Sequence, residues 1–331
     1  MITAPVGYSQ EIRRAYLVPS IVPVPAPAPN PGFGGWNLAT ATGAVTIAYG
    51  NNVYVATRSD QTPQILTSTD GVIWTGSSPL TAAGNKWNSL GFGNGLFVAA
   101  SAIPSGYSNW TGIIATSTNG TVWTNVVSDS AFGFSANGCN SVSYANGQWI
   151  VFGYNNNNVT VYTSSTGAAG SWVQHTPSTT VPQTPCVYSS ISGLYIGAGQ
   201  AVGSVLTSSD AVNWYADYAY GATSLCYGAG KLVAVAGGGN CAVSSDGGVT
   251  WATHTIAGNS GWEAVTWSSA ANCFEAVAYL LGSYYAVTSP DGVSWSTQAA
   301  PGTGGWVAVT SSPSMLVAVG YGVMTNSINF S

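Results

Sequence analysis

Short apolar runs alternate with clusters of glycine, asparagine, serine and threonine along most of the chain. Residues 96–100 and 232–236 are typical, because every residue in them is apolar and a glycine-containing turn precedes each run. Runs this short, bounded by turn residues, predict β-strands that are covered on both faces rather than helices. The pattern therefore predicts an all-β fold.

A turn of the form Ser/Thr-Asp-Gly followed by a tryptophan recurs between such strands. Its copies are residues 67–74, 116–123, 207–214, 244–251 and 288–295. The glycine tolerates the positive φ of a tight turn, and the aspartate can accept hydrogen bonds from the backbone N–H groups of the turn. The tryptophan starts the next strand and buries a large face. Each copy is therefore expected to be a β-hairpin.

The repeat sets the architecture. The aromatic residues at the end of the turn define seven intervals of roughly 40 residues, the length of a four-stranded propeller blade; they are Trp36, Trp74, Trp123, Trp172, Trp214, Trp251, Trp295 and Phe330. Inner strands are expected at residues 44–49, 88–92, 140–144, 185–189, 223–227, 263–267 and 306–310. Apolar second strands are expected at residues 53–56, 96–100, 149–153, 194–198, 232–236, 273–278 and 315–320. The sequence thus predicts a seven-bladed β-propeller over residues 36–331.

The last blade lacks a full outer strand after its final turn, and an open strand edge invites aggregation. Residues near 35–40 look like an outer strand with no blade before them. We therefore expect them to complete the last blade and to join the two ends of the ring. The alternative is that residues 328–331 close the blade alone.

The repeated turn resembles the Asp-box, or BNR, repeat of sialidase-like β-propellers. The copy at residues 244–251 matches the Ser-x-Asp-x-Gly-x-x-Trp pattern in full. The copies at Asp70 and Asp291 are one residue shorter, Asn119 replaces the aspartate in another, and Ala211 replaces the glycine in the copy at Asp210. The resemblance implies the fold, with the turn acids in a structural role. It does not imply sialidase chemistry, since that family uses three arginines and only Arg58 lies in the predicted ring.

Residues 1–35 differ from the repeats. Six prolines between positions 19 and 31 favour an extended polyproline II arm. The arm also holds a charge cluster and apolar side chains, and its candidate docking residues are Ile12, Arg13, Arg14, Tyr16 and Leu17. We expect it to anchor the ring to a partner; the alternative is a leader that docks on nothing. It lacks the basic and unbroken apolar regions of a signal peptide.

Composition excludes several classes of function. Charged residues make up 5% of the chain against roughly a quarter in typical domains, and the net charge is −5. With five Lys and Arg in total, the chain has no basic patch for nucleic acid. It has no apolar run of about 20 residues for membrane insertion. The five cysteines show no metal-ligand spacing, so buried thiols are expected, and no metal or other cofactor is predicted.

Catalytic groups are scarce. A glycosidase needs two carboxylates facing each other across a cleft. Glu263 begins an inner strand and is expected at the mouth of the central channel, but the repeat places no second acid beside it. His175 and His254 fall in outer-strand positions, where exposed edge histidines are expected. The chain is therefore predicted not to be an enzyme.

Sugar binding by neutral groups remains open, because loops on a rigid ring are common binding sites. The candidate ligand-binding residues are Tyr107, Trp110, Tyr154 and Asn156, which lie in two irregular loops of the second and third blades. Loop packing is the alternative role for each of them.

These observations favour a non-enzymatic virion protein with a structural or host-recognition role, such as a phage tail fibre, spike or surface-decoration component. Its expected partners are other virion subunits, held through residues 1–35, and a host surface glycan or receptor. Its expected location is the extracellular particle. The alternative is a soluble carbohydrate-binding propeller, and a propeller glycosidase ranks below both.

Overall fold

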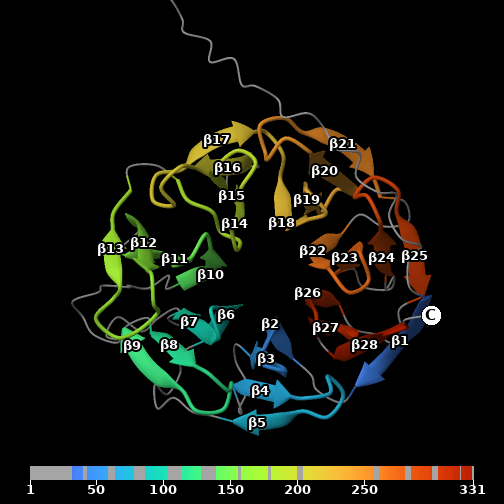
Figure 1. Ribbon diagram of the computed structural model, residues 1–331, viewed down its shortest axis with the longest axis horizontal. Coiled ribbons are helices and arrows are strands. Elements are labelled where there is room, and N and C mark those ends of the chain that lie inside the picture. The colour runs from blue at the N-terminus through green and yellow to red at the C-terminus, as the bar shows by residue number, and fades with distance from the viewer. Residues whose placement is uncertain are drawn as a thin grey trace, which may run out of the picture.

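The computed structural model describes residues 32–39, 43–58, 64–77, 86–102, 113–127, 139–155, 158–177, 180–199, 204–256, 261–279, 285–299, 305–320 and 322–329. These residues form seven four-stranded antiparallel sheets, arranged as blades around a central axis (Figure 1). The predicted seven-bladed β-propeller is confirmed.

In six blades the four strands follow each other in the sequence from the axis outward. Blade 1 contains β2 (Ala44–Gly50), β3 (Val53–Arg58), β4 (Ile65–Ser68) and β5 (Thr75–Ser77). Blade 2 contains β6 (Lys86–Gly93), β7 (Leu96–Ala102), β8 (Ile114–Ser117) and β9 (Thr124–Val127). Blade 3 contains β10 (Cys139–Ala145), β11 (Gln148–Asn155), β12 (Asn158–Ser164) and β13 (Val173–His175). Blades 4 to 6 are β14 (Val187–Ser189), β15 (Leu194–Gly199), β16 (Ser204–Ser208) and β17 (Tyr215–Tyr218); β18 (Ala222–Gly228), β19 (Lys231–Ala236), β20 (Asn240–Ser244) and β21 (Ala252–Thr255); and β22 (Trp262–Ser268), β23 (Cys273–Ala278), β24 (Tyr285–Ser289) and β25 (Ser296–Ala299).

Blade 7 joins the two ends of the sequence. It contains β26 (Trp306–Ser311), β27 (Met315–Gly320) and β28 (Val323–Asn329), and its fourth strand is β1 (Gly32–Ala39). Figure 1 shows blue β1 beside red β28, and Trp36 pairs with Asn326 in their antiparallel register. This confirms the prediction that residues near 35–40 complete the last blade. The strand begins at Gly32, before the expected boundary at residue 36.

The second strand of each blade is covered on both faces by its neighbours. All six residues of β23 are buried, and so are all residues of β15, β19 and β27 except the first. Alternating side chains in a strand point to opposite faces, so each second strand packs against both adjacent blades. Continuous apolar runs in the sequence follow from this arrangement.

Glycines let neighbouring blades approach closely near the axis. A Cβ atom added at Gly50, Gly93 or Gly228 would overlap the aromatic side chain of the next blade, which is Phe92, Tyr144 or Trp267 respectively. The aromatic ring is also held by its own hairpin, as where Trp267 lies 4.7 Å from Phe274 between ring centroids. Each such aromatic residue is therefore wedged between two blades.

Serines on inner strands also link blades. The Oγ of Ser89 accepts a hydrogen bond from Val142 N at 2.7 Å, that of Ser143 from Cys186 N at 2.7 Å, and that of Ser224 from Val265 N at 3.2 Å. These bonds satisfy buried backbone donors at the edge of an inner strand, where no neighbouring strand is available to do so.

Two sequence predictions about single residues have clear outcomes. All five cysteines are buried and free, as expected of thiols that act as small apolar side chains. His175 and His254 lie on the outer strands β13 and β21, as predicted, but both are half-buried rather than exposed. His175 Nε2 lies 2.9 Å from Thr163 Oγ1, which accounts for its partial burial. No helix in the described part of the chain is long and apolar enough to cross a membrane.

Candidate functional site

The repeated turn is built by one serine, one acid and one indole. In blade 1, Ser68 Oγ donates to Asp70 Oδ1 at 2.9 Å and accepts from Gly71 N at 2.8 Å. Asp70 Oδ1 also accepts from the backbone N–H groups two and three residues later, at 2.9 and 2.8 Å. Trp74 Nε1 donates to Gly71 O at 2.9 Å. The turn is thus closed by side chains, as the sequence pattern predicted.

Other blades repeat this network. In blade 2, Asn119 Oδ1 takes the place of the carboxylate oxygen and accepts from Thr121 N and Val122 N at 3.0 and 2.9 Å. The turn acids of blades 4, 5 and 6 are Asp210, Asp246 and Asp291, and each accepts from its serine and from two backbone N–H groups. An amide oxygen therefore takes the place of a carboxylate oxygen in the turn.

These hydrogen bonds favour the ionised acids. The backbone N–H of Ile73 is the main cause of the lowered pKa of Asp70, followed by that of Val72. Partial desolvation raises the pKa of Asp210, but hydrogen bonds from Asn213, Val212 and Ser208 outweigh it and hold the pKa at about 2. The turn acids thus stay charged wherever the ring is folded at moderate pH.

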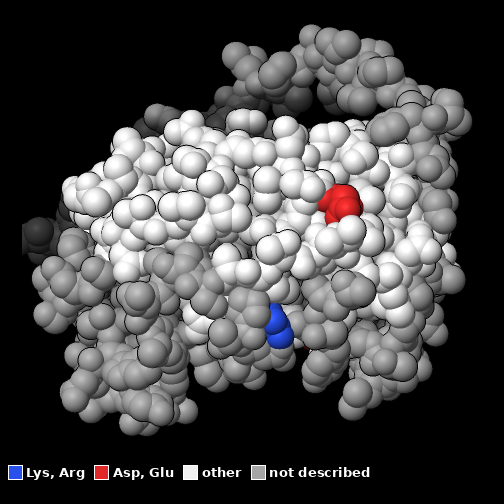
Figure 2. Space-filling model, turned by 90° about the horizontal axis from the view of Figure 1, so that it is seen from below, with Lys and Arg blue, Asp and Glu red and all other residues white. Residues whose placement is uncertain are grey.

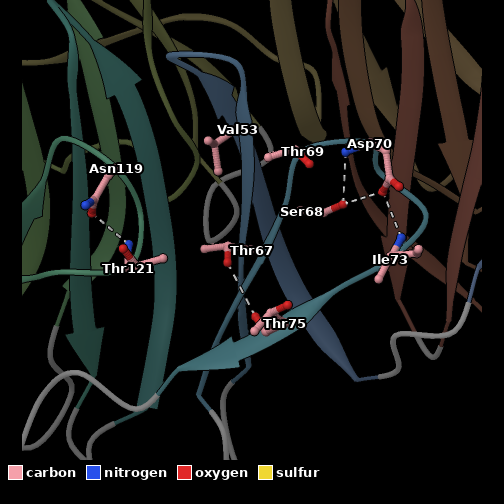
Figure 3. A pocket seen from close by; sticks show the side chains of 9 residues that line it. All are labelled: Val53, Thr67, Ser68, Thr69, Asp70, Ile73, Thr75, Asn119 and Thr121. Carbon is pink, nitrogen blue, oxygen red and sulfur yellow. Dashed lines mark hydrogen bonds between the residues drawn. The ribbon is translucent and has the colours of Figure 1, made fainter.

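A groove of about 330 Å³ lies beside the turn of blade 1 (Figure 3). Blade 1 contributes an apolar pair, Val53 and Ile73, together with hydroxyl groups and the carboxylate of Asp70. Blade 2 contributes Asn119 and Thr121 on the opposite side. The remaining lining residues are Thr67, Ser68, Thr69 and Thr75.

Blade 1 differs from blades 4 and 5 at the residue before the tryptophan. Asn213 Nδ2 donates to Asp210 Oδ2 at 2.9 Å, and Thr250 Oγ1 donates to Asp246 Oδ2. Blade 1 has Ile73 at that position, and its side chain is 72% exposed. Within the described part of the chain, Asp70 Oδ2 accepts no hydrogen bond, and the same is true of Asp291 Oδ2 in blade 6.

Asn51 fixes the two walls of the groove relative to each other. It sits in the β2–β3 hairpin turn with φ of 48° and donates from Nδ2 to Gly95 O at 2.9 Å and to Thr118 O at 2.8 Å. Because Thr118 precedes Asn119, this bond positions the blade 2 wall. Comparable contacts between a hairpin and the next turn run from Ser192 Oγ to Gly247 O and from Lys231 Nζ to Asp291 O.

The central channel is the second hollow. It has a volume of about 290 Å³ and is lined by inner-strand residues, including Thr46, Asn88, Thr223 and Glu263. Glu263 lies where the sequence predicted it, and burial raises the pKa of its carboxyl group. No second acid lines this channel in the described part of the ring. A single carboxyl group of this kind can bind a ligand but cannot form an acid/base pair.

The described acids form no group suited to a metal ion. Among the residues that the structure describes, no three His, Cys, Asp or Glu side chains are placed to hold a metal ion. Asp70 is the one acid among the residues that line the groove. The chemistry offered there is hydrogen bonding and apolar contact.

The candidate residues from the sequence fall almost entirely outside the described residues. Tyr107, Trp110 and Asn156 lie outside them, as do the arm residues Ile12, Arg13, Arg14, Tyr16 and Leu17. The backbone of Tyr154 belongs to β11 and pairs with Val159, but its side chain is not described. The groove was missed because the turn acids were assigned a structural role alone. An exposed apolar residue precedes the tryptophan in blades 1 and 2, where Ile73 and Val122 stand in place of the polar residues seen before Trp214 and Trp251.

Replacing Asp210 by alanine is expected to lower the free energy of unfolding by about 1 kcal/mol, as loss of a capping carboxylate does at a helix N-terminus. The substitution removes the acceptor for Val212 N and Asn213 N. Urea unfolding at neutral pH measures the loss. Asp210→Asn is the matched control and is expected to cost less, because its amide oxygen can hold the turn as Asn119 does in blade 2, and only the hydrogen bond from Asn213 Nδ2 and the negative charge are lost.

Measuring the stability of the protein at acidic pH provides a second test of this turn. The folded-state pKa of Asp210, about 2, is below its ordinary value of 3.8. The contribution of ionised Asp210 to the free energy of unfolding is therefore complete above pH 3.8, and it is lost as the pH falls through about 2. Equal acid sensitivity of the parent chain and of Asp210→Asn would contradict this assignment.

Comparisons with known proteins agree with this architecture. Residues 117–261 match the family model described as the DUF6242 beta propeller domain. No curated protein sequence matches the chain. Among solved structures, YCF48 bound to D1 peptide is similar at 14% identity and a TM-score of 0.66, covering 92% of this chain and 100% of that chain.

Two further structures have the same fold. A catalytically inactive virginiamycin B lyase from Staphylococcus aureus with quinupristin aligns at 9% identity and a TM-score of 0.69, covering 89% of this chain and 99% of that one. The WD40 repeats of RRP9 align at 8% identity and a TM-score of 0.63, covering 91% and 99%. Identities this low establish similarity of fold and carry no function across. Sequence, structure and comparisons together identify the chain as a seven-bladed β-propeller.

Proposed function

We propose that this propeller is a non-enzymatic recognition protein whose groove beside Asp70 binds a neutral, polyhydroxylated ligand such as a surface glycan. The proposal includes a place in a larger particle: a virion component, such as a tail fibre, spike or surface-decoration protein, attached through residues 1–35. The repeated turn is assigned in the same proposal to the Asp-box type.

The open carboxylate oxygen of Asp70 is the observation that carries the ligand class. A carboxylate oxygen is a strong acceptor for sugar hydroxyl groups. The amide of Asn119 and the hydroxyl groups of Thr69 and Thr121 add neutral donors and acceptors in the same groove. The exposed side chain of Ile73 offers an apolar contact for the C–H face of a sugar ring.

The sparse charge of the ring supports a neutral ligand. Figure 2 shows one side of the molecule, on which acidic and basic side chains are sparse in the described surface. Several described acids have other roles: Asp210, Asp246 and Asp291 hold turns, and Glu275 is fully buried. Without an adjacent second acid, the groove supports binding rather than hydrolysis.

The virion assignment rests on composition and on the N-terminal segment. The chain combines a nearly uncharged, Gly- and Thr-rich ring with a proline-rich segment suited to docking on another subunit. The runner-up is a free carbohydrate-binding propeller. It requires the same groove but gives residues 1–31 no role in assembly.

The ligand is tested by binding the full chain to an array of neutral glycans, followed by titration calorimetry with the best hit. Asp70→Asn is expected to weaken binding at least tenfold, or about 1.4 kcal/mol, since it replaces the free oxygen acceptor by an amide donor. The fold is expected to survive, because Asn119 supports the same turn.

Asp246→Asn is the matched control, because it makes the same change in a turn outside the groove. It is expected to leave binding unchanged. An equal loss in both variants would exclude the groove, and absence of any glycan hit would reject the ligand class.

Assembly is tested by cryo-EM of the source particle and by deleting residues 1–31. The virion proposal expects the deletion to abolish incorporation while glycan binding persists. Normal incorporation of the truncated chain would reject attachment through this segment. If no particle contains the protein, the virion proposal is rejected and the alternative, a free carbohydrate-binding propeller, is supported.

A further inference from the structure

Six inner strands share the same irregularity. In β22, the pairing with β23 skips Glu263, which is an extra residue between Trp262 and Ala264. The same β-bulge occurs in β2, β6, β10, β18 and β26, and Figure 1 shows all six strands next to the central axis. A β-bulge changes the direction of the extra side chain and is over-represented next to active sites. Six blades thus present an extra residue at an equivalent position near the axis.

Five of these extra residues line the central channel, and we call them the bulge layer: Val45, Asn88, Thr223, Glu263 and Val307. The side chain of the sixth lies outside the described part of the chain. The channel volume of about 290 Å³ is close to the lower end of the range for small-molecule sites, ~300–1,000 Å³. The bulge layer therefore faces a hollow that is large enough for a small ligand.

Two polar side chains of the bulge layer use a donor to link neighbouring blades. Asn88 Nδ2 donates to Cys139 O of blade 3 at 2.8 Å, and Thr223 Oγ1 donates to Trp262 O of blade 6 at 2.7 Å. The carboxylate of Glu263 has no donor. The groups that the bulge layer still offers to a ligand are therefore mainly acceptors.

The strongest of these acceptors lack partners within the described part of the chain. Asn88 Oδ1 is buried and accepts no hydrogen bond there. The Glu263 carboxylate has no hydrogen-bond partner among the described residues, and those that line the channel include no Lys or Arg. A buried acceptor without a partner is unusual in native proteins and indicates a bound water, ion or ligand. The channel is thus complementary to a hydrogen-bond donor, above all to a positively charged one.

Apolar side chains continue around the ring from Glu263. Val307 of blade 7 and Val45 of blade 1 are the next members of the bulge layer after Glu263, because blade 7 packs between blades 6 and 1. Further apolar residues line the channel: Ile47, Leu90, Leu225, Val265 and Val309. A ligand whose charged group meets Glu263 therefore has an aliphatic wall beside it.

We propose that the bulge layer binds a small aliphatic molecule that carries a primary ammonium group. An ammonium group has three donors and no acceptor, so it matches a layer whose unpartnered groups are acceptors. Its charge is opposite to that of Glu263, and charge-assisted hydrogen bonds are stronger than neutral ones. The aliphatic chain contacts Val307 and Val45. This site is separate from the groove beside Asp70, which is lined by residues of blades 1 and 2 away from the inner strands.

Isothermal titration calorimetry of the full chain tests the ligand class. The probes are n-butylammonium and 1-butanol, which share the aliphatic chain and differ in charge. An ionic strength of about 0.15 M screens exposed carboxylates. The amine is expected to bind at least about tenfold more tightly than the alcohol, because hydrogen bonds to charged groups contribute more than neutral ones. Equal affinities, or no binding of the amine, would overturn the proposal in favour of a channel that holds only water.

Glu263→Gln tests the residue. Glutamine keeps the shape of the side chain and one oxygen acceptor but removes the negative charge. Binding of the amine is expected to weaken at least about tenfold, whereas binding of the alcohol stays unchanged. Thermal unfolding of the variant verifies its fold. If Glu263→Gln does not fold, Val307→Trp is the second variant, because its indole fills the channel beside Glu263 and is expected to abolish binding of the amine.

Asp217→Asn is the matched control, because it removes one negative charge from an exposed position on the outer strand β17. It is expected to bind the amine as the parent chain does. An equal loss in Glu263→Gln and in this control would overturn the assignment to the bulge layer. Unchanged binding of the amine in Glu263→Gln, or in Val307→Trp, would overturn it as well.

Discussion

Removing residues 1–39 is expected to abolish the closed ring, whereas removing residues 1–31 is expected to leave it folded. The longer deletion removes β1 and all of its pairs with β28. It also removes Trp36, which is only 6% exposed and lies in the cluster between blades 6 and 7. Burial of one tryptophan is worth roughly 4–6 kcal/mol gross, from 150–250 Å² at about 25 cal/mol/Å². That is comparable to the entire stability of many domains, about 5–15 kcal/mol.

Light scattering and thermal unfolding of the two truncated chains provide the measurement. The shorter deletion keeps every strand of the described ring and is therefore the matched control. The longer deletion exposes the edge of β28, so soluble aggregates are expected in place of a monodisperse ring. A cooperative transition of unchanged midpoint in the chain starting at residue 40 would show that β1 is dispensable.

Substituting Gly228 by alanine is expected to lower the free energy of unfolding by about 3 kcal/mol, the upper part of the range for overpacking. A Cβ at this position would overlap Cβ, Cγ and Cδ2 of Trp267, which belong to the base of the side chain rather than its flexible end. Phe274 lies beside Trp267 on the same face of blade 6, at 4.7 Å between ring centroids, and limits its movement. Blades 5 and 6 must therefore separate to admit one methyl group.

Gly238→Ala is the matched control for this prediction. It lies in the turn between β19 and β20, and an added Cβ would meet no atom within 4 Å. Its unfolding free energy is expected to change by less than about 0.5 kcal/mol, as for other surface substitutions. Chemical unfolding of the two variants side by side measures the difference. Similar costs for both would mean that the close approach at Trp267 contributes little.

Most of the fold was predictable from the sequence, because each blade solves the same packing problem with the same residues. The turn at Asp70 and its four copies mark the outer hairpins of five blades through side-chain hydrogen bonds that are local in sequence. The covered second strands, such as β23, show as unbroken apolar runs. The completion of blade 7 by the N-terminal strand could also be inferred, since Trp36 precedes the first blade and no predicted strands precede Trp36.

The groove was not predictable in the same way. Its walls belong to two blades, and a hydrogen bond from Asn51 to Thr118 O fixes one turn beside the next. The sequence shows each turn separately and does not show this distance. The prediction that the histidines are exposed was wrong for a related reason, because Thr163 of the neighbouring strand contacts His175.

Glu275 illustrates a further limit. In the sequence it was one of the few acids without an assigned role. A charged residue within an apolar strand usually indicates an exposed edge, yet β23 is buried along its whole length. Among the described residues, the Glu275 carboxyl group has no hydrogen-bond partner that would explain its burial in a blade interior.

The composite seventh blade also has a consequence for synthesis on the ribosome. The residues of β1 leave the exit tunnel first, and their partner β28 is the final strand of the ring. At a synthesis rate of 5–20 residues per second, the interval between synthesis of β1 and synthesis of β28 lasts roughly 15–60 s. Throughout that interval β1 lacks the strand with which it pairs. The unpaired strand favours binding of the nascent chain to a chaperone or to another nascent copy. Pairing of β1 with β28 therefore follows synthesis of the other strands of the described ring, and slowing translation after blade 6 is expected to lower the yield of monomeric protein.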